Sequence, residues 1–190
     1  MPESDISRAA VANEDVGRAA RVLVEGLLKL VEGERLLVYV DKGSDPRVRE
    51  GIHARATLLG AQCDCFELDE DLTLEESALR LGQHIRAGCY DVVCELSTKY
   101  FYRTPVARII HDVGARVYWL PGLDPVAFSR CVGAVDHQRM YAFGLALRQV
   151  LKSARLLHVR TEKGTDLRMR IGMRSLPRLA SRLTGRQVPK

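Results

Sequence analysis

The stretch Asp91-Val-Val-Cys-Glu-Leu-Ser-Thr-Lys-Tyr-Phe-Tyr-Arg-Thr-Pro105 decides the fold. It begins with an apolar, β-branched run from Val92 to Leu96, which has the length and composition of a buried strand in a parallel sheet. Polar residues and three consecutive aromatic residues follow at once. The Thr104-Pro105 pair is then typical of a helix start. The sequence therefore predicts a strand, a loop rich in polar and aromatic side chains, and a helix.

The same alternation of strand and helix recurs on both sides of this stretch. Asp45-Pro46 and Asp124-Pro125 are typical helix starts, and Thr73 with Glu76 forms a capping-box pattern. Gly33 and Gly88 are expected to end helices. The predicted strands cover residues 35–41, 61–68, 92–96 and 115–120, and the predicted helices cover 15–31, 46–60, 73–88, 105–113, 125–130 and 136–153.

Four strands that alternate with helices predict an α/β fold, a three-layer, mostly parallel four-stranded sheet in the order 2-1-3-4. Residues 1–153 are expected to form this Rossmann-like domain. Residues 154–172 alternate apolar and charged side chains on either side of Gly164, which predicts an antiparallel β-hairpin extension. Residues 173–190 form a basic tail, either disordered or a short docked helix.

Charge and hydropathy exclude several classes of protein. The net charge of +5 equals that of the last seventeen residues, and residues 1–173 are balanced, so we expect no nucleic-acid-binding face on the folded body. No window of about 18 apolar residues predicts a membrane span, and the first residues do not resemble a signal peptide. A cytoplasmic protein with no membrane partner is expected.

Motifs for metals and common cofactors are missing from the sequence. The five cysteines form no C-x-x-C pair and are expected to be reduced thiols, and the five histidines have no metal-ligand spacing. No glycine-rich dinucleotide fingerprint and no Walker A sequence is present, which disfavours nucleotide binding. We therefore expect neither a metal site nor a cofactor.

A ligand site is predicted at the carboxyl edge of the sheet. In open α/β sheets ligands bind where the strand order reverses, which here lies between the first and third strands. The loops that follow the first, third and fourth strands should meet at this edge. The side chains expected to gather there are Asp41, Lys42, Ser44, Ser97, Thr98, Lys99, Tyr100, Phe101, Tyr102 and the Pro121-Gly122 turn.

Two further residues have alternative interpretations. Glu95 lies inside the third strand, so its carboxylate must either be paired or line a site. A structural ion pair with Lys99 or Arg103 is one interpretation, and a catalytic role is the other. Trp119 is either a core residue or a platform for a ligand, and the aromatic residues after the third strand could equally pack their loop onto the sheet.

Several segments together resemble the amino-terminal domain of the aminopeptidase T (thermophilic leucyl aminopeptidase) metallopeptidases, over roughly residues 15–172. The segments are Asp41 to Pro46, Glu95 to Tyr100, Tyr118 to Pro125 and Thr161 to Asp166. The resemblance implies that the family's metal ligands lie in a second domain beyond the hairpin, so none transfers to this sequence. It also implies a homodimer, a peptide-accepting cleft, and similarity to accessory proteins of ribosomally made peptide pathways such as the crocagin type.

The expected function is therefore peptide binding without metallopeptidase activity. Lys42 or Lys99 would receive a carboxylate, and Ser97 and Thr98 would hydrogen-bond the peptide backbone. Tyr100, Tyr102 and Trp119 would cover apolar side chains. One alternative is an enzyme that tailors or cyclises its peptide, with Glu95 or Asp41 as general base and Lys99 or Tyr102 as acid. Another is a dimeric scaffold whose partner recognises the basic tail.

Overall fold

The computed structural model describes residues 15–171, so the predicted basic tail lies outside the described residues. The chain divides into two compact units, one ending at Val135 and the other beginning at Asp136. The sequence predicted a division after residue 153. The structure instead groups the long helix that begins after Asp136 with the hairpin, and we call residues 136–171 the C-terminal unit.

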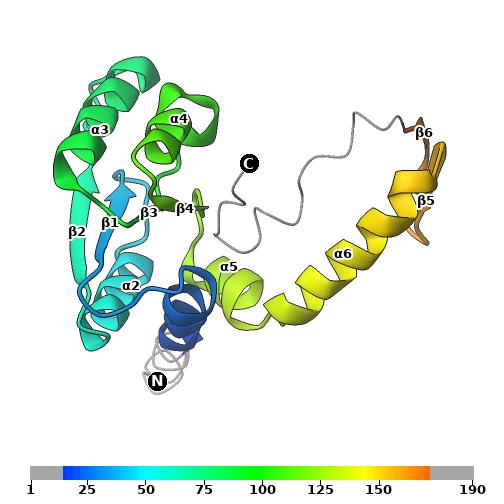
Figure 1. Ribbon diagram of the computed structural model, residues 1–190, viewed down its shortest axis with the longest axis horizontal. Coiled ribbons are helices and arrows are strands. Elements are labelled where there is room, and N and C mark those ends of the chain that lie inside the picture. Colours follow the sequence, from blue (N-terminus) through cyan, green and yellow to red (C-terminus); the bar gives the residue numbers. More distant parts are fainter. Residues whose placement is uncertain (1–14, 172–190) are drawn as a thin grey trace, which may run out of the picture. The chain divides into compact units, whose positions relative to one another are not determined.

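A four-stranded parallel sheet forms the centre of the first unit. The strands are β1 (Arg35–Val40), β2 (Gln62–Glu67), β3 (Val92–Glu95) and β4 (Arg116–Trp119). Their order is β2-β1-β3-β4, and each pair of neighbours is parallel (Figure 1). The predicted fold class is confirmed.

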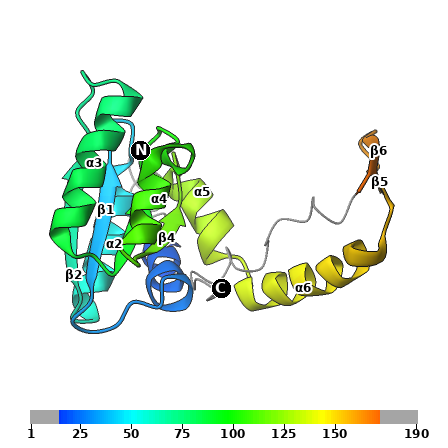
Figure 2. The same ribbon diagram turned by 45° about the horizontal axis from the view of Figure 1, so that its top comes forward.

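Helices cover both faces of the sheet, so the unit has three layers (Figure 2). One core packs under η1 (Val22–Leu27), α2 (Pro46–Leu58), α5 (Pro125–Phe128) and η3 (Ser129–Gly133). The other packs under α3 (Leu74–Gly88) and α4 (Pro105–Asp112). Because both faces are covered, β1 and β3 are apolar along nearly their whole length, as the sequence indicated.

The predicted helix starts are confirmed in atomic detail. Asp45 and Asp124 each accept a hydrogen bond from a backbone N–H of the first turn, and Thr73 forms a complete capping box with Glu76. The first helix departs from the prediction, since it widens into the π-helix η1 and ends at Leu27 rather than residue 31. Arg116 of β4 donates to the carbonyl oxygens of Leu28 and Lys29, which draws the chain out of the helix.

The C-terminal unit consists of α6 (His137–Ser153) and a hairpin of β5 (Leu156–Arg160) and β6 (Asp166–Arg170). Asp136 caps α6, and Gly164 has the positive φ that the hairpin turn requires, so both predictions are confirmed. No residue from 136 to 171 is buried. Among residues 15–171, no helix is long and apolar enough to span a bilayer.

Candidate functional site

Asp41 joins the loop after β1 to the loop after β3. Its Oδ2 accepts hydrogen bonds from the backbone N–H and the hydroxyl of Thr98, at 2.7 and 2.8 Å. The Ser44 hydroxyl lies 3.0 Å from both Asp41 Oδ1 and the Leu96 carbonyl oxygen. Only 5 % of Asp41 is exposed. Its carboxylate therefore holds the two loops together and has little surface open to a ligand.

Gly43 packs closely against Thr98 at the same junction. A Cβ at Gly43 would lie 2.8 Å from Thr98 Cγ2, so a residue with a side chain there would have to displace the Thr98 side chain that bonds Asp41. The loop after β4 joins the loops after β1 and β3, because the Gly122 N–H donates to the Ser97 carbonyl oxygen at 3.1 Å. The loops after β1, β3 and β4 thus lie side by side, as the strand order predicts.

Glu95 is fully buried, and its partners are not the ones predicted. Its Oε1 accepts from the backbone N–H of Phe101 at 3.1 Å and lies 3.2 Å from the Ser97 hydroxyl. None of the ion pairs among residues 15–171 includes Glu95, so the predicted ion pair with Lys99 or Arg103 is wrong. The physical reason is that the chain folds back after Ser97 and brings its own N–H and O–H groups to the carboxylate.

Burial raises the pKa of Glu95 to about 7, against the lowering effect of its hydrogen bonds to Phe101 and Ser97. The nearby hydroxyl of Tyr39 also lowers the pKa of Glu95. The Tyr39 hydroxyl and Glu95 Oε2 do not form a hydrogen bond with each other, and both atoms are buried without a hydrogen-bond partner. Burial, with the charge of Glu95 nearby, raises the pKa of Tyr39 in turn. Glu95 is therefore poised between its two protonation states near neutral pH.

The three consecutive aromatic residues separate into one core residue and two surface residues. Phe101 is fully buried, with its ring edge-on to Tyr39 at 5.6 Å. Tyr100 and Tyr102 are 59 % and 41 % exposed. Tyr102 lies edge-on to Tyr100 at 6.0 Å and to Trp119 at 6.4 Å. Tyr100, Tyr102 and Trp119 form what we call the aromatic cluster.

One cationic group, that of Arg103, adjoins the aromatic cluster, and Lys99 directly precedes Tyr100 in the sequence. The guanidinium of Arg103 lies 5.4 Å from the centre of the Tyr102 ring, within the range of a cation–π contact. Neither Arg103 nor the half-buried Lys99 forms an ion pair among the described residues. The sequence analysis considered Arg103 only as a partner of Glu95. Because Arg103 directly follows Tyr102 in the sequence, its contact with the Tyr102 ring could have been predicted.

Other predicted binding residues are engaged elsewhere. Lys42 is exposed and lies 3.8 Å from Glu70, in the loop after β2. Ser97 is fully buried, with its hydroxyl 2.9 Å from the Lys99 carbonyl oxygen as well as close to Glu95. The hydroxyls of Ser44, Ser97 and Thr98 therefore stabilise the loops, and the aromatic cluster with Lys99 and Arg103 is the exposed part of the predicted site.

A separate cavity of about 240 Å³ involves none of the predicted site residues. It lies between α2 and the sheet and is lined by Val38, Arg49, Glu50, His53, Cys63 and Cys65. Burial raises the pKa of Cys63 to about 12, so this thiol stays protonated at neutral pH and is a poor nucleophile. No group of side chains suited to a metal ion is present among residues 15–171.

Comparisons with known proteins support an α/β fold but do not assign the chain to a family. No protein-family model and no curated protein matches the chain. Its structure is similar to 2,5-dihydroxypyridine dioxygenase from Pseudomonas putida KT2440, with a TM-score of 0.62 and 21 % identity over 84 % of this chain and 48 % of that one. This chain thus spans about half the length of the dioxygenase, and the likeness shows the fold alone.

Two other solved structures are similar at lower scores. They are the N-terminal domain of FACL13 from Mycobacterium tuberculosis (TM-score 0.40, 17 % identity, 67 % of this chain, 30 % of that chain) and CurK enoyl reductase (TM-score 0.36, 12 % identity, 71 % and 49 %). None of the three is an aminopeptidase T domain, so that resemblance stays a prediction.

Proposed function

We propose that this chain is a peptide-binding protein and that the peptide binds across the aromatic cluster. The observation that carries the proposal is the exposure of Tyr100 and Tyr102, grouped with Trp119 at the carboxyl edge of the sheet and with Arg103 over the Tyr102 ring. Grouped exposed rings are typical of binding surfaces, because they offer a large apolar area at a small cost in side-chain entropy.

The chemistry of the cluster favours an extended peptide with apolar side chains and an acidic group. The rings provide faces and edges for apolar side chains. Lys99 and Arg103, without acidic partners among the described residues, would pair with a carboxylate of the peptide. By its resemblance to aminopeptidase T domains, the protein would be a cytoplasmic homodimer without metallopeptidase activity, acting in maturation of a ribosomally made peptide.

A second candidate is an enzyme that tailors the bound peptide. The observation in its favour is Glu95, whose pKa of about 7 suits general acid–base catalysis. Because Glu95 is fully buried, this function would require the loop from Ser97 to Arg103 to open. A change in peptide mass that occurs with the wild-type protein and is lost in Glu95→Gln would support it.

Trp119 is the only tryptophan in the chain, so its fluorescence tests the proposed function directly. We expect short apolar peptides with a free carboxylate to change its emission, and their amidated counterparts to bind more weakly. Tyr102→Ala should weaken binding about 10- to 30-fold, as for a central interface residue. Tyr102→Phe keeps the ring and should bind nearly as wild type does.

The matched control is Leu58→Ala, which removes an exposed apolar side chain at the end of α2, where the helix meets the other edge of the sheet. It should leave the affinity unchanged. Equal peptide affinity in Tyr102→Ala and wild type would overturn the assignment of the site. The absence of any peptide-dependent change in Trp119 emission would overturn the function itself.

A further inference from the structure

Strand β4 lies at one edge of the sheet, and one of its sides is unpaired. Among the described strands only β3 pairs with it (Figure 1). The N–H groups of Arg116 and Leu120 point to β3, where they donate to backbone carbonyl oxygens at 2.9 and 3.0 Å. Because successive residues of a strand point their N–H and C=O groups to opposite sides, those of Val117 and Trp119 point away from β3. Within residues 15–171 these outward groups have no hydrogen-bond partner.

The two edges of the sheet differ in the features that discourage pairing. Edge strands of soluble proteins usually carry charges, prolines or bulges, which prevent pairing with another chain. The edge strand β2 ends in Glu67, an exposed acid with no ion pair in the described part of the chain. In β4 the one charged residue is Arg116, which Glu34 holds at 2.6 Å, and the other three residues are valine, tyrosine and tryptophan. None of the four is buried, so β4 has the composition of a strand that pairs with a partner.

A peptide at the aromatic cluster needs partners for its backbone. The hydroxyls that the sequence suggested for this role, those of Ser44, Ser97 and Thr98, already stabilise the loops. Trp119 belongs to both β4 and the aromatic cluster, so the unpaired edge of β4 adjoins the cluster. The side chains of Val117 and Trp119 lie on the same face of the sheet, beside the core under α3 and α4.

We infer, on the basis of the proposed function, that the peptide binds as a fifth strand, parallel to β4 and hydrogen-bonded to its unpaired edge. Val117 and Trp119 each have one outward N–H and one outward C=O, so together they can exchange four hydrogen bonds with the peptide backbone. The two peptide side chains beside Val117 and Trp119 lie two residues apart on one face, and apolar residues fit there.

The direction of the peptide follows from the position of Arg103. Parallel strands have their carboxyl ends at the same edge of the sheet, which here is the edge with the aromatic cluster. Tyr102 lies 6.4 Å from Trp119, the last residue of β4, and the Arg103 guanidinium lies 5.4 Å from the centre of the Tyr102 ring. A parallel peptide brings its C-terminal carboxylate to this guanidinium, whereas an antiparallel one brings its ammonium group there, which Arg103 repels. The ligand class is therefore peptides with a free carboxyl terminus and alternating apolar residues before it.

Backbone N-methylation of the peptide tests the strand pairing. The probe is an apolar hexapeptide with a free carboxylate, methylated at one backbone nitrogen at a time, with its affinity measured by Trp119 emission. Only alternate N–H groups of an added strand point to β4. We therefore expect a loss of about 10-fold or more at every second position and little change at the positions between.

The outcomes separate this inference from the proposed function. If the unmodified hexapeptide binds but methylation weakens binding equally at all positions, or at none, strand pairing is overturned and the proposed function stands. If the unmodified hexapeptide does not bind, the proposed function is overturned as well.

Amide hydrogen exchange, followed by NMR, locates the pairing on the protein. In the free protein the Val117 and Trp119 amides should exchange faster than that of Tyr118, which points to β3. The hexapeptide should slow the exchange of the two outward amides. Slow exchange of both in the free protein would overturn the inference, because another part of the chain or a second copy would then already cover this edge.

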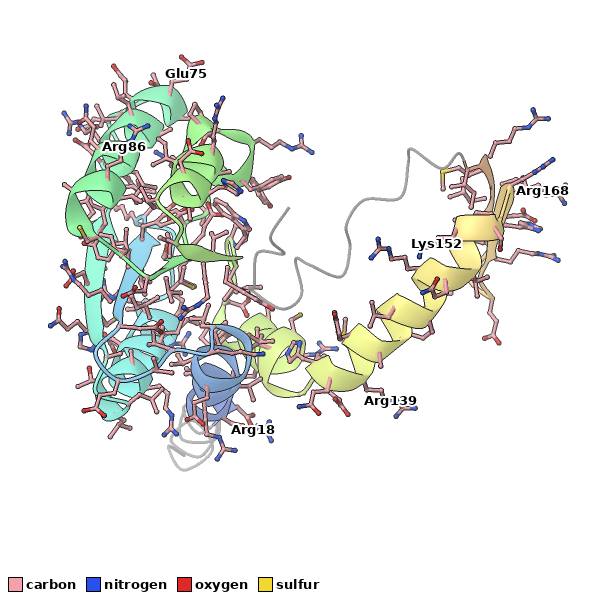
Figure 3. The ribbon with its side chains drawn as sticks, in the orientation of Figure 1. Arg18, Glu75, Arg86, Arg139, Lys152 and Arg168 are labelled. Carbon is pink, nitrogen blue, oxygen red and sulfur yellow. The ribbon has the colours of Figure 1, made fainter. Side chains whose placement is uncertain are left out.

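Arg103→Met tests the direction. It should weaken binding of the free-carboxylate hexapeptide about 5- to 10-fold and leave binding of the amidated hexapeptide unchanged. The matched control is Arg86→Met, since Arg86 projects from α3 on the side of the sheet away from β4 (Figure 3), and it should leave both affinities unchanged. Equal affinity of Arg103→Met and wild type for the free-carboxylate hexapeptide would overturn the parallel arrangement.

Discussion

Replacing Glu95 by glutamine should make the α/β unit more stable at alkaline pH. The amide oxygen can accept the same hydrogen bonds, from the Phe101 N–H and the Ser97 hydroxyl, that Oε1 accepts now. The amide nitrogen would take the place of the unpartnered Oε2 and face the part of the core where the Tyr39 hydroxyl is also unpartnered. The substitution therefore keeps the loop and removes a buried charge.

The magnitude follows from the pKa. Burial raises the pKa of Glu95 from 4.5 to about 7, and at about 1.4 kcal/mol per unit this amounts to about 3 kcal/mol over the whole titration. Because the folded state binds this proton more tightly than the unfolded state does, folding is favoured below pH 4.5. That advantage is lost as the pH rises from 4.5 to 7. Glutamine does not titrate, so the variant keeps the stability that wild type loses.

The assay is urea unfolding followed by Trp119 emission at pH 5, 7 and 8.5. The free energy of unfolding of Glu95→Gln, minus that of wild type, should rise with pH and level off above pH 8. Glu76→Gln is the control, because hydrogen bonds from Thr73 lower the pKa of Glu76 below 4.5, so its benefit is lost only at more acidic pH and its difference from wild type should stay nearly constant from pH 5 to 8.5. A difference between Glu95→Gln and wild type that is independent of pH would refute the reasoning.

Two further substitutions test the packing of the α/β unit by urea unfolding. Gly88→Ala places a methyl against the Tyr90 ring, so it should displace that ring and cost about 1–3 kcal/mol, whereas Gly26→Ala meets no atom within 4 Å. Arg116→Met removes two hydrogen bonds to Glu34, at 2.6 and 2.8 Å, and should cost about 1–2 kcal/mol at neutral pH. Because Arg116 lowers the pKa of Glu34, this cost should shrink as the pH falls.

The architecture of the first unit was predictable because its signals are local. Apolar runs of four to six residues, Asp-Pro pairs and the Thr73 capping box each specify their own element, and right-handed crossovers then favour the observed strand order. The meeting of the loops at the carboxyl edge follows from that order. The hairpin followed from its alternating pattern and Gly164.

The finer details of the site depend on tertiary contacts that the sequence does not display. Which of three adjacent rings turns inward is decided by the short 3₁₀ turn η2 (Phe101–Arg103) and by Tyr39, which is distant in sequence. Glu95 obtains its partners because the loop folds back, whereas charge alone suggested Lys99. The early end of the first helix likewise depends on Arg116, almost ninety residues away.

The boundary after Val135 also changes the meaning of the overall charge. Residues 1–135 hold 21 acidic and 16 basic groups, and residues 136–190 hold 3 and 13, so the two parts carry −5 and +10. The balance over residues 1–173 conceals this separation. At low ionic strength, where the screening length is tens of ångströms, the chain should behave as a bipolar molecule. We expect an anionic resin to retain the chain through residues 136–190, and a cationic resin to retain it through residues 1–135.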